Sequence, residues 1–237
     1  MNALANPEVG KYLNEHFVSS FQRVATFRIV GKQKQGGNVA AYFCAPDGRV
    51  LHCIAGPVNA DTMLKEAKWV IETATKAVKD CKGDGAKFKA LMRTAHAERL
   101  RTEHGLVVEA VTFDNFEEVD PNSALQYKDP TGRPLAPKLP APPINGPDVK
   151  FEHLQEAAFA KKAAGAAPIS DKSGRTWTLG NQGRVHLLLA AHGMAKIETI
   201  YGSVFEGILN ERITTRPVEV VDPFPNRGKL KVAPMPN

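Results

Sequence analysis

Residues 38–55 read NVAAYFCAPDGRVLHCIA, and they decide the local fold of this chain. Two apolar runs, residues 39–44 and residues 50–55, flank the turn dipeptide Asp47-Gly48. An Asp-Gly pair between apolar runs is a strong short-range signal for a β-hairpin, because a tight turn needs residues that tolerate positive φ. The sequence therefore predicts two antiparallel strands joined at this turn.

Helix and strand patterns flank the predicted hairpin. Asn6-Pro7-Glu8 is typical of a helix start, since Asn can cap, Pro suits the first helical position and Glu suits the positive end of the dipole. Residues 24–30, VATFRIV, are apolar and β-branched, as in a strand. After Gly56-Pro57, residues 60–79 carry an apolar face at helical spacing. This face contains Met63, Leu64, Ala67, Val70, Ile71, Ala74 and Ala77.

Four phrases in this part of the chain are similar to thioredoxin-like domains: NPEV at 6–9, YLN at 12–14, NVAAYF at 38–43 and PDGRVL at 46–51. The resemblance covers the first third of the chain. It implies an α/β protein with a thioredoxin-like sheet and flanking helices.

Two features of the thioredoxin-like family are missing. The family has a Cys-x-x-Cys motif just upstream of these phrases, which would precede Met1 here. It also has a cis-proline before the third strand, where this chain has Gly36-Gly37-Asn38. The resemblance therefore implies a domain without ordinary thiol–disulfide exchange, unless a Cys-x-x-Cys segment precedes Met1.

The composition along the chain predicts three parts. Residues 1–117 are expected to form the thioredoxin-like domain, and residues 118–149 a proline-rich linker or arm. Proline excludes a regular helix or a central strand in that arm. Residues 150–237 are expected to form a mainly helical C-terminal extension with an extended tail, including a short helix at 151–164. Apolar residues between Met194 and Asn210 recur at helical spacing, so this helix needs either the N-terminal sheet or a second subunit as a partner.

Overall composition is that of a globular protein. The chain has 237 residues, of which 43% are hydrophobic and 24% charged. No apolar run of about 18 residues predicts a membrane-spanning helix. The first residues lack the basic and apolar regions of a secretory signal, so we expect a cytoplasmic location. Although the net charge is +6, basic and acidic residues are mixed, and nucleic-acid binding is not expected.

The three cysteines are too few for a disulfide scaffold. If the turn centres on Asp47-Gly48, Cys53 faces Tyr42 and Cys44 faces Leu51. The two sulfurs then occupy diagonal positions about 7 Å apart, beyond easy disulfide geometry. We interpret Cys44 and Cys53 as small buried hydrophobes, with a redox-sensing thiol pair or a metal thiolate site as the alternative.

Cys81 is the best candidate for a reactive thiol. It lies at the end of the predicted long helix, near Lys79 and Lys82. Positive charge lowers the pKa of a thiol and so favours the nucleophilic thiolate.

Histidines are not predicted to form a metal site. His96 and His104 lie on one predicted helix about 12 Å apart, so that helix alone cannot bring them to one ion. Their segment is expected to be a solvated charged face. His52, on the hairpin, and His186 and His192, flanking a short apolar helix, are expected to be surface or partly satisfied residues. No cofactor is predicted.

Two functions follow from these patterns. The first is a non-catalytic thioredoxin-like protein that acts in protein–protein binding or assembly, as a homo-oligomer or as a subunit of a complex. The alternative is a thiol-disulfide oxidoreductase or redox sensor that uses Cys81, or Cys44 with Cys53. The phosphate loop, dinucleotide fingerprint and nucleophile elbow of common enzymes are absent from the sequence.

Overall fold

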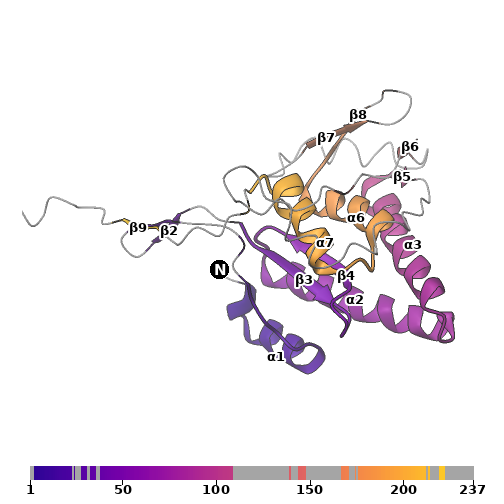
Figure 1. The fold of residues 1–237 in the computed structure, drawn as a ribbon, viewed down its shortest axis with the longest axis horizontal. Coiled ribbons are helices and arrows are strands. Elements are labelled where there is room, and N and C mark those ends of the chain that lie inside the picture. Colours follow the sequence, from indigo (N-terminus) through magenta and orange to yellow (C-terminus); the bar gives the residue numbers. More distant parts are fainter. Residues whose placement is uncertain are drawn as a thin grey trace, which may run out of the picture.

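The chain folds as a mixed α/β protein (Figure 1). A computed structural model describes residues 3–22, 24, 28–30, 33–35, 38–108, 139, 144–147, 167–170, 174, 176–211, 213 and 219–221. The helical elements are η1 (Ala3–Ala5), α1 (Pro7–His16), α2 (Ala60–Cys81), α3 (Gly85–His104), α6 (Asn181–His192), α7 (Ile197–Gly202) and the π-helical η4 (Ser203–Ile208). The strands are β1 (Arg28–Val30), β2 (Gln33–Gln35), β3 (Ala40–Cys44), β4 (Val50–Ala55), β5 (Leu106–Val108), β6 (Ile144–Pro147), β7 (Ala167–Ser170), β8 (Thr176–Leu179) and β9 (Glu219–Val221).

The described strands form small separate sheets. Strands β2, β1 and β9 make one sheet in that order, and β3–β4, β5–β6 and β7–β8 each make a pair. The expected α/β class is therefore confirmed. Among the described strands, however, no thioredoxin-like sheet is assembled.

The β3–β4 hairpin has the predicted register over most of its length. Tyr42 pairs with Cys53 and Phe43 pairs with His52, as expected. The pairing then shifts after Phe43, so Cys44 lies opposite Val50 rather than Leu51. A β-bulge inserts an extra residue on one strand, and the prediction for Cys44 was wrong for this reason.

Capping residues set the ends of the helices, mostly where the sequence indicated. The Asn6 side chain accepts hydrogen bonds from the first turn of α1, and Asn59 accepts one from Thr62 N. The Asp84 side chain caps α3 in the same way. Gly105 ends α3 with φ 67°, a left-handed conformation that glycine adopts without a Cβ clash.

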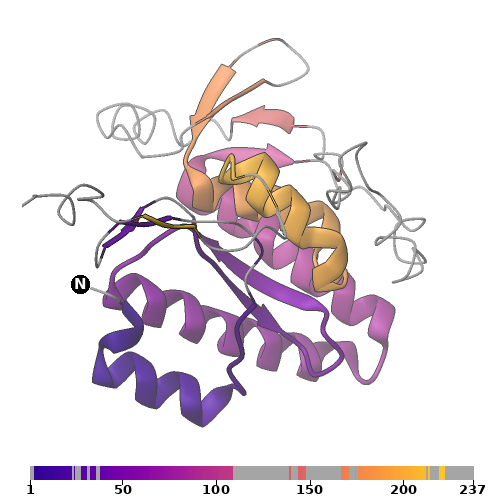
Figure 2. The same ribbon diagram turned by 60° about the vertical axis from the view of Figure 1, so that its left-hand side comes forward.

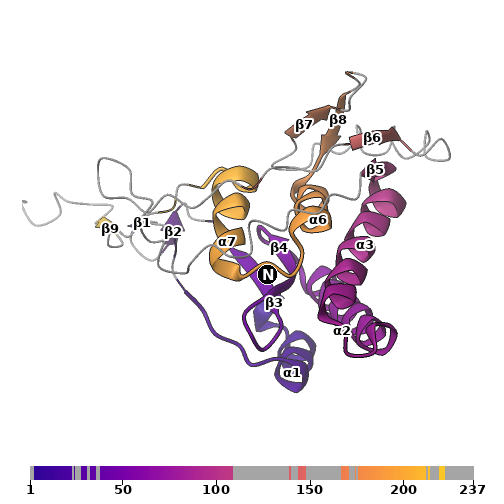
Figure 3. The ribbon, with the colours of Figure 1, turned by 45° about the vertical axis from the view of Figure 1, so that its right-hand side comes forward.

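The C-terminal helices pack on the hairpin of the same chain. Figure 2 shows α6 and α7 on one side of the hairpin and α2 on the other, and Figure 3 shows α6 beside α3. All six residues of β4 are buried as a result. One core cluster joins both ends of the chain and includes Val50, Cys53, Leu189, Ile200, Val204 and Phe205. The apolar face predicted between Met194 and Asn210 is thus covered within the chain.

Some predicted elements lie outside the described residues. These are the helix at 151–164 and most of the proline-rich arm at 118–149. The predicted strand at 24–30 is described as a strand only at β1. Of the helices in the described part of the chain, none is both long and apolar enough to cross a membrane.

Candidate metal centre

Three histidines from distant parts of the sequence meet in the interior. His52 comes from β4, His96 from α3 and His186 from α6, and each is 0% exposed. One ring nitrogen from each lies within 4.8 Å of those from the other two. We call His52, His96 and His186 the histidine cluster.

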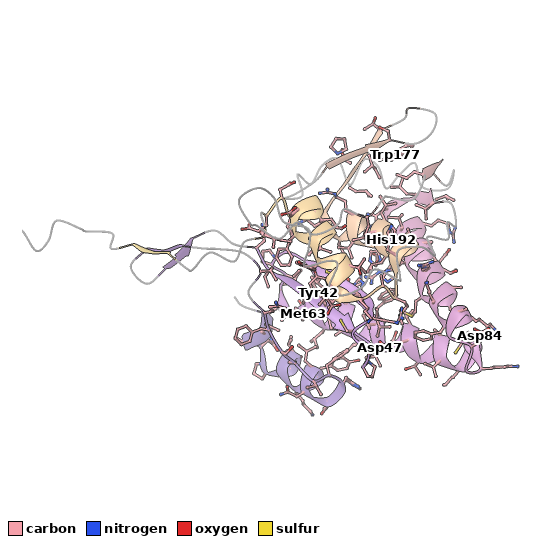
Figure 4. The ribbon with its side chains drawn as sticks, viewed as in Figure 1. Tyr42, Asp47, Met63, Asp84, Trp177 and His192 are labelled. Carbon is pink, nitrogen blue, oxygen red and sulfur yellow. The ribbon has the colours of Figure 1, made fainter. Side chains whose placement is uncertain are left out.

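The close packing of α6 on α3 brings two of these histidines together. Gly183, in the first turn of α6, makes this packing feasible, because a Cβ there would lie 3.1 Å from ring atoms of His104. His192, at the other end of α6, is buried among the same packed helices (Figure 4). The α3–α6 contact therefore depends on a small residue at one position.

The hydrogen bonds of His96 define its tautomer. Its Nε2 lies 2.8 Å from the Leu51 carbonyl oxygen, which can only accept, so Nε2 carries the hydrogen. Its Nδ1 then holds a lone pair, 2.9 Å from Nδ1 of His186. His186 must donate this bond from Nδ1, which leaves a lone pair on its Nε2. That Nε2 is buried and has no partner among the described residues.

A buried ion pair orients His52. Nε2 of His52 lies 2.9 Å from Oε2 of Glu66, while Arg99 donates to both Glu66 oxygens at 2.6 Å. Burial raises the pKa of Glu66, but the hydrogen bonds from His52 and Arg99 outweigh that effect and hold it at about 2. Because Glu66 is ionised, His52 donates from Nε2. Its Nδ1 therefore carries a lone pair, and this buried atom has no hydrogen-bond partner in the described structure.

All three rings are neutral near pH 7. Burial, together with the neighbouring His52, lowers the pKa of His96 to about 3. Burial likewise lowers the pKa of His186, and it lowers that of His52 despite the hydrogen bond to Glu66. Neutral imidazole is the form that binds metal ions.

Aromatic side chains enclose the histidine cluster. The Trp69 ring centroid lies 4.9 Å from that of His52, 5.1 Å from that of His96 and 5.7 Å from that of His186. The guanidinium carbon of Arg99 lies over the Trp69 ring, 4.7 Å from the ring centroid. Phe43 stacks on His52 at 6.1 Å. The surroundings are therefore apolar apart from the Glu66–Arg99 pair.

The donor set fits a transition-metal ion. At a tetrahedral zinc the ligand nitrogens lie about 3.3 Å apart, and the cluster nitrogens span separations from 2.9 Å to at most 4.8 Å. In metal sites a ligand histidine usually donates its second nitrogen to a carboxylate or a backbone carbonyl. His52 does so to Glu66, and His96 does so to the Leu51 carbonyl.

Comparisons with protein-family models, curated proteins and solved structures found no match to this chain. The assignment of the site therefore rests on its own geometry.

The structure places Cys53 and Cys81 in the interior and Cys44 at a half-buried position. All three are described, and each is a free thiol. Burial, with the carboxylates of Glu198 and Asp47, raises the pKa of Cys44 to about 11, and burial raises the pKa of Cys53 as well. Cys81 is buried at the end of α2, where its thiol donates to the Val78 carbonyl. At Cys44 and Cys53 the raised pKa disfavours the thiolate that exchange needs.

The histidines were the residues that sequence reasoning missed. The expectation that His96 lies on a solvated face was wrong, since that face packs against α6 and β4. His52, His186 and His192 were expected to be surface or partly satisfied residues. A surface position is wrong for all three, because they are buried, but His52 and His186 are partly satisfied, each with one ring nitrogen paired and one unpaired among the described residues. A signal was present: His52 interrupts the apolar run of residues 50–55, and His186 stands between apolar neighbours.

Proposed function

We propose that this protein binds a metal ion through His52, His96 and His186. The observation that carries the proposal is the buried Nδ1 of His52, which has no hydrogen-bond partner in the described structure while Glu66 holds the opposite nitrogen. A buried acceptor left unsatisfied costs about 1–3 kcal/mol. An ion at the cluster would bind this lone pair and the Nδ1 lone pair of His96, and His186 would join them through Nδ1 once its hydrogen moves to Nε2.

The chemistry of the donors indicates the class of metal. Imidazole suits Zn²⁺, Cu²⁺, Ni²⁺ and Co²⁺, whereas Mg²⁺ and Ca²⁺ prefer oxygen ligands. We expect Zn²⁺ as the physiological ion, with the other three as substitutes. Three protein ligands leave a fourth position open, which is the arrangement of catalytic zinc sites rather than of closed structural ones. A zinc ion in such a site supplies a bound water with a pKa of about 7.

Calorimetric titration of the full chain with Zn²⁺ tests this proposal. We expect one ion per chain. His96→Gln and His186→Gln should each weaken binding by more than the roughly 10–100-fold that loss of an outer partner costs. His16→Gln is the matched control, because His16 lies exposed on α1, and its binding should be unchanged. Binding that is weak and non-stoichiometric, or that falls equally in the control, would contradict the proposal.

Binding and assembly form a second candidate function. We propose, as the sequence suggested, that the protein also acts in protein–protein binding or assembly, and that residues 17–22, which follow α1, serve as a contact surface. Val18 and Phe21 support this idea, since they are 103% and 98% exposed on the same short non-helical segment. Large apolar side chains that gather on an exposed surface mark an interaction site.

Light scattering over a wide dilution range tests the second candidate. We expect a mass larger than one chain of 25.8 kDa, which Phe21→Ser and Val18→Ser should reduce. Val78→Ser is the control, because Val78 is 60% exposed on α2. A monomer at all concentrations would remove the case for self-association.

A further inference from the structure

A groove runs between α2 and α3 and leads toward the histidine cluster. Its volume is about 520 Å³, and Ala77, Leu91 and Ala95 form part of its apolar lining. At one end its lining consists of Trp69, Arg99 and Glu103. These are the residues that separate the groove from the buried histidines.

Only a thin layer of side chains lies between the groove and the cluster. Trp69 lines the groove and also contacts all three histidine rings. Arg99 lines the groove as well, and it connects to His52 through one residue, Glu66. Trp69 is therefore the side chain that contacts both the groove and all three rings of the cluster.

The walls of the groove carry oxygen atoms that suit a hydrated cation. Thr73, Thr94 and Thr102 contribute hydroxyl groups, and Asp80 contributes a carboxylate, whereas the Glu98 carboxylate is paired with Arg101. The positive charge of Arg99 is offset, because it is paired with both Glu66 and Glu103. Lys76 also lines the groove, so a divalent ion in the groove meets one exposed ammonium group but no unpaired guanidinium.

We propose that the α2–α3 groove is the route by which the metal ion reaches and leaves the histidine cluster, with Trp69 as the barrier at its inner end. This inference rests on the proposed metal binding. The route determines the rates of metal uptake and release, whereas the proposed function concerns the stoichiometry and affinity of metal binding. The two can therefore fail separately.

Stopped-flow kinetics on the full chain tests the route, with Zn²⁺ for uptake and EDTA for removal. Trp69→Ala should accelerate both rates several-fold, and the dissociation constant should change less than either rate. Thr94→Trp should slow both rates, because Thr94 is exposed on the groove wall. Thr75→Trp introduces the same side chain at an exposed position of α2 outside the groove, and its rates should match those of the unaltered protein.

Each outcome has a defined meaning. Equal rates in Thr94→Trp and Thr75→Trp, with tight binding in both, would overturn the route and leave metal binding intact. Faster exchange in Gln182→Ala, with no effect at Thr94, would also overturn it, because Gln182 approaches His52 from α6. If Trp69→Ala does not fold, Trp69→Phe and the Thr94 pair decide the question. Absence of Zn²⁺ binding in the unaltered protein would overturn the route together with the proposed function.

Discussion

Nε2 of His52 lies 2.9 Å from Oε2 of Glu66, and both side chains are buried. Arg99 holds the same carboxylate with two further hydrogen bonds. This arrangement turns the unprotonated Nδ1 of His52 away from the carboxylate and leaves it without a hydrogen-bond partner among the described residues. Glu66 therefore acts as a positioning residue for the proposed metal ligand.

Glu66→Gln should weaken Zn²⁺ binding by about 10–100-fold, the usual effect of losing an outer partner of a ligand histidine. It should also lower the free energy of unfolding by about 3–5 kcal/mol, because Arg99 would be left buried without its main partner. Calorimetry and urea denaturation measure the two effects. Glu103→Gln is the control: Glu103 also pairs with Arg99 but its side chain is 34% exposed, so both effects should be small. Equal losses in the two variants would argue against a positioning role.

Acid should destabilise the metal-free protein. The pKa of His96 is about 3 in the folded state against 6.5 ordinarily. Between these values the unfolded chain binds a proton that the folded chain does not, so stability falls as the pH drops from 6.5 toward 3. Glu66, with a folded pKa of about 2 against 4.5, contributes stability that is lost below its ordinary pKa.

The slope of this loss can be measured by urea denaturation at about pH 7.5, 6.5 and 5.5. Each buried histidine contributes up to about 1.4 kcal/mol per pH unit. His96→Gln should flatten the profile, and His16→Gln should leave it unchanged. A profile that is level below pH 6.5 in the unaltered protein would show that the histidines charge without unfolding the chain.

Trp69 should report metal binding by fluorescence. The chain has 2 tryptophans, so Trp177→Phe leaves the Trp69 indole, in contact with the histidine rings, as the single emitter. Cu²⁺ should quench this emission and saturate at one equivalent, because the ion would lie close to the ring. The double variant with His186→Gln should not show saturation. Equal quenching with and without His186 would place the copper elsewhere.

Gly183→Ala should destabilise the protein although alanine favours helix. Its new Cβ would lie 3.0 Å from Leu179 and 3.1 Å from His104, and overpacking of this kind costs about 1–3 kcal/mol. Gly10→Ala is the matched control on α1, where nothing lies within 4 Å of the new Cβ. It should stabilise the protein by up to about 1 kcal/mol. Thermal or urea denaturation measures both, and the same sign in both variants would contradict the packing argument.

Local sequence signals predicted the local structure well. Asp47-Gly48 predicted the hairpin turn, and Asn6 predicted the start of α1. Each of these depends on neighbouring residues alone, through turn geometry or capping. The bulge at Cys44 was not predictable in this way, because Arg49 and Val50 also bond to the chain around Lys196 and Met194.

The histidine cluster depends on contacts that no local pattern reveals. His52 and His96 come from β4 and α3, which only α2 separates in the sequence, but His186 lies far along the chain and reaches the cluster only because α6 packs on α3 and β4. An isolated histidine in an apolar run indicates burial and no more. Its partners depend on the tertiary packing of the two ends of the chain.

X-ray absorption spectroscopy of the zinc-loaded protein tests the metal centre most directly, because it reports the atoms bound to the ion. We expect nitrogen ligands at about 2.0–2.1 Å with the outer-shell scattering of three imidazole rings, reduced to two rings in His186→Gln. A sulfur ligand at about 2.3 Å, or a shell of oxygen atoms without imidazole scattering, would contradict the assignment of His52, His96 and His186 as the metal ligands.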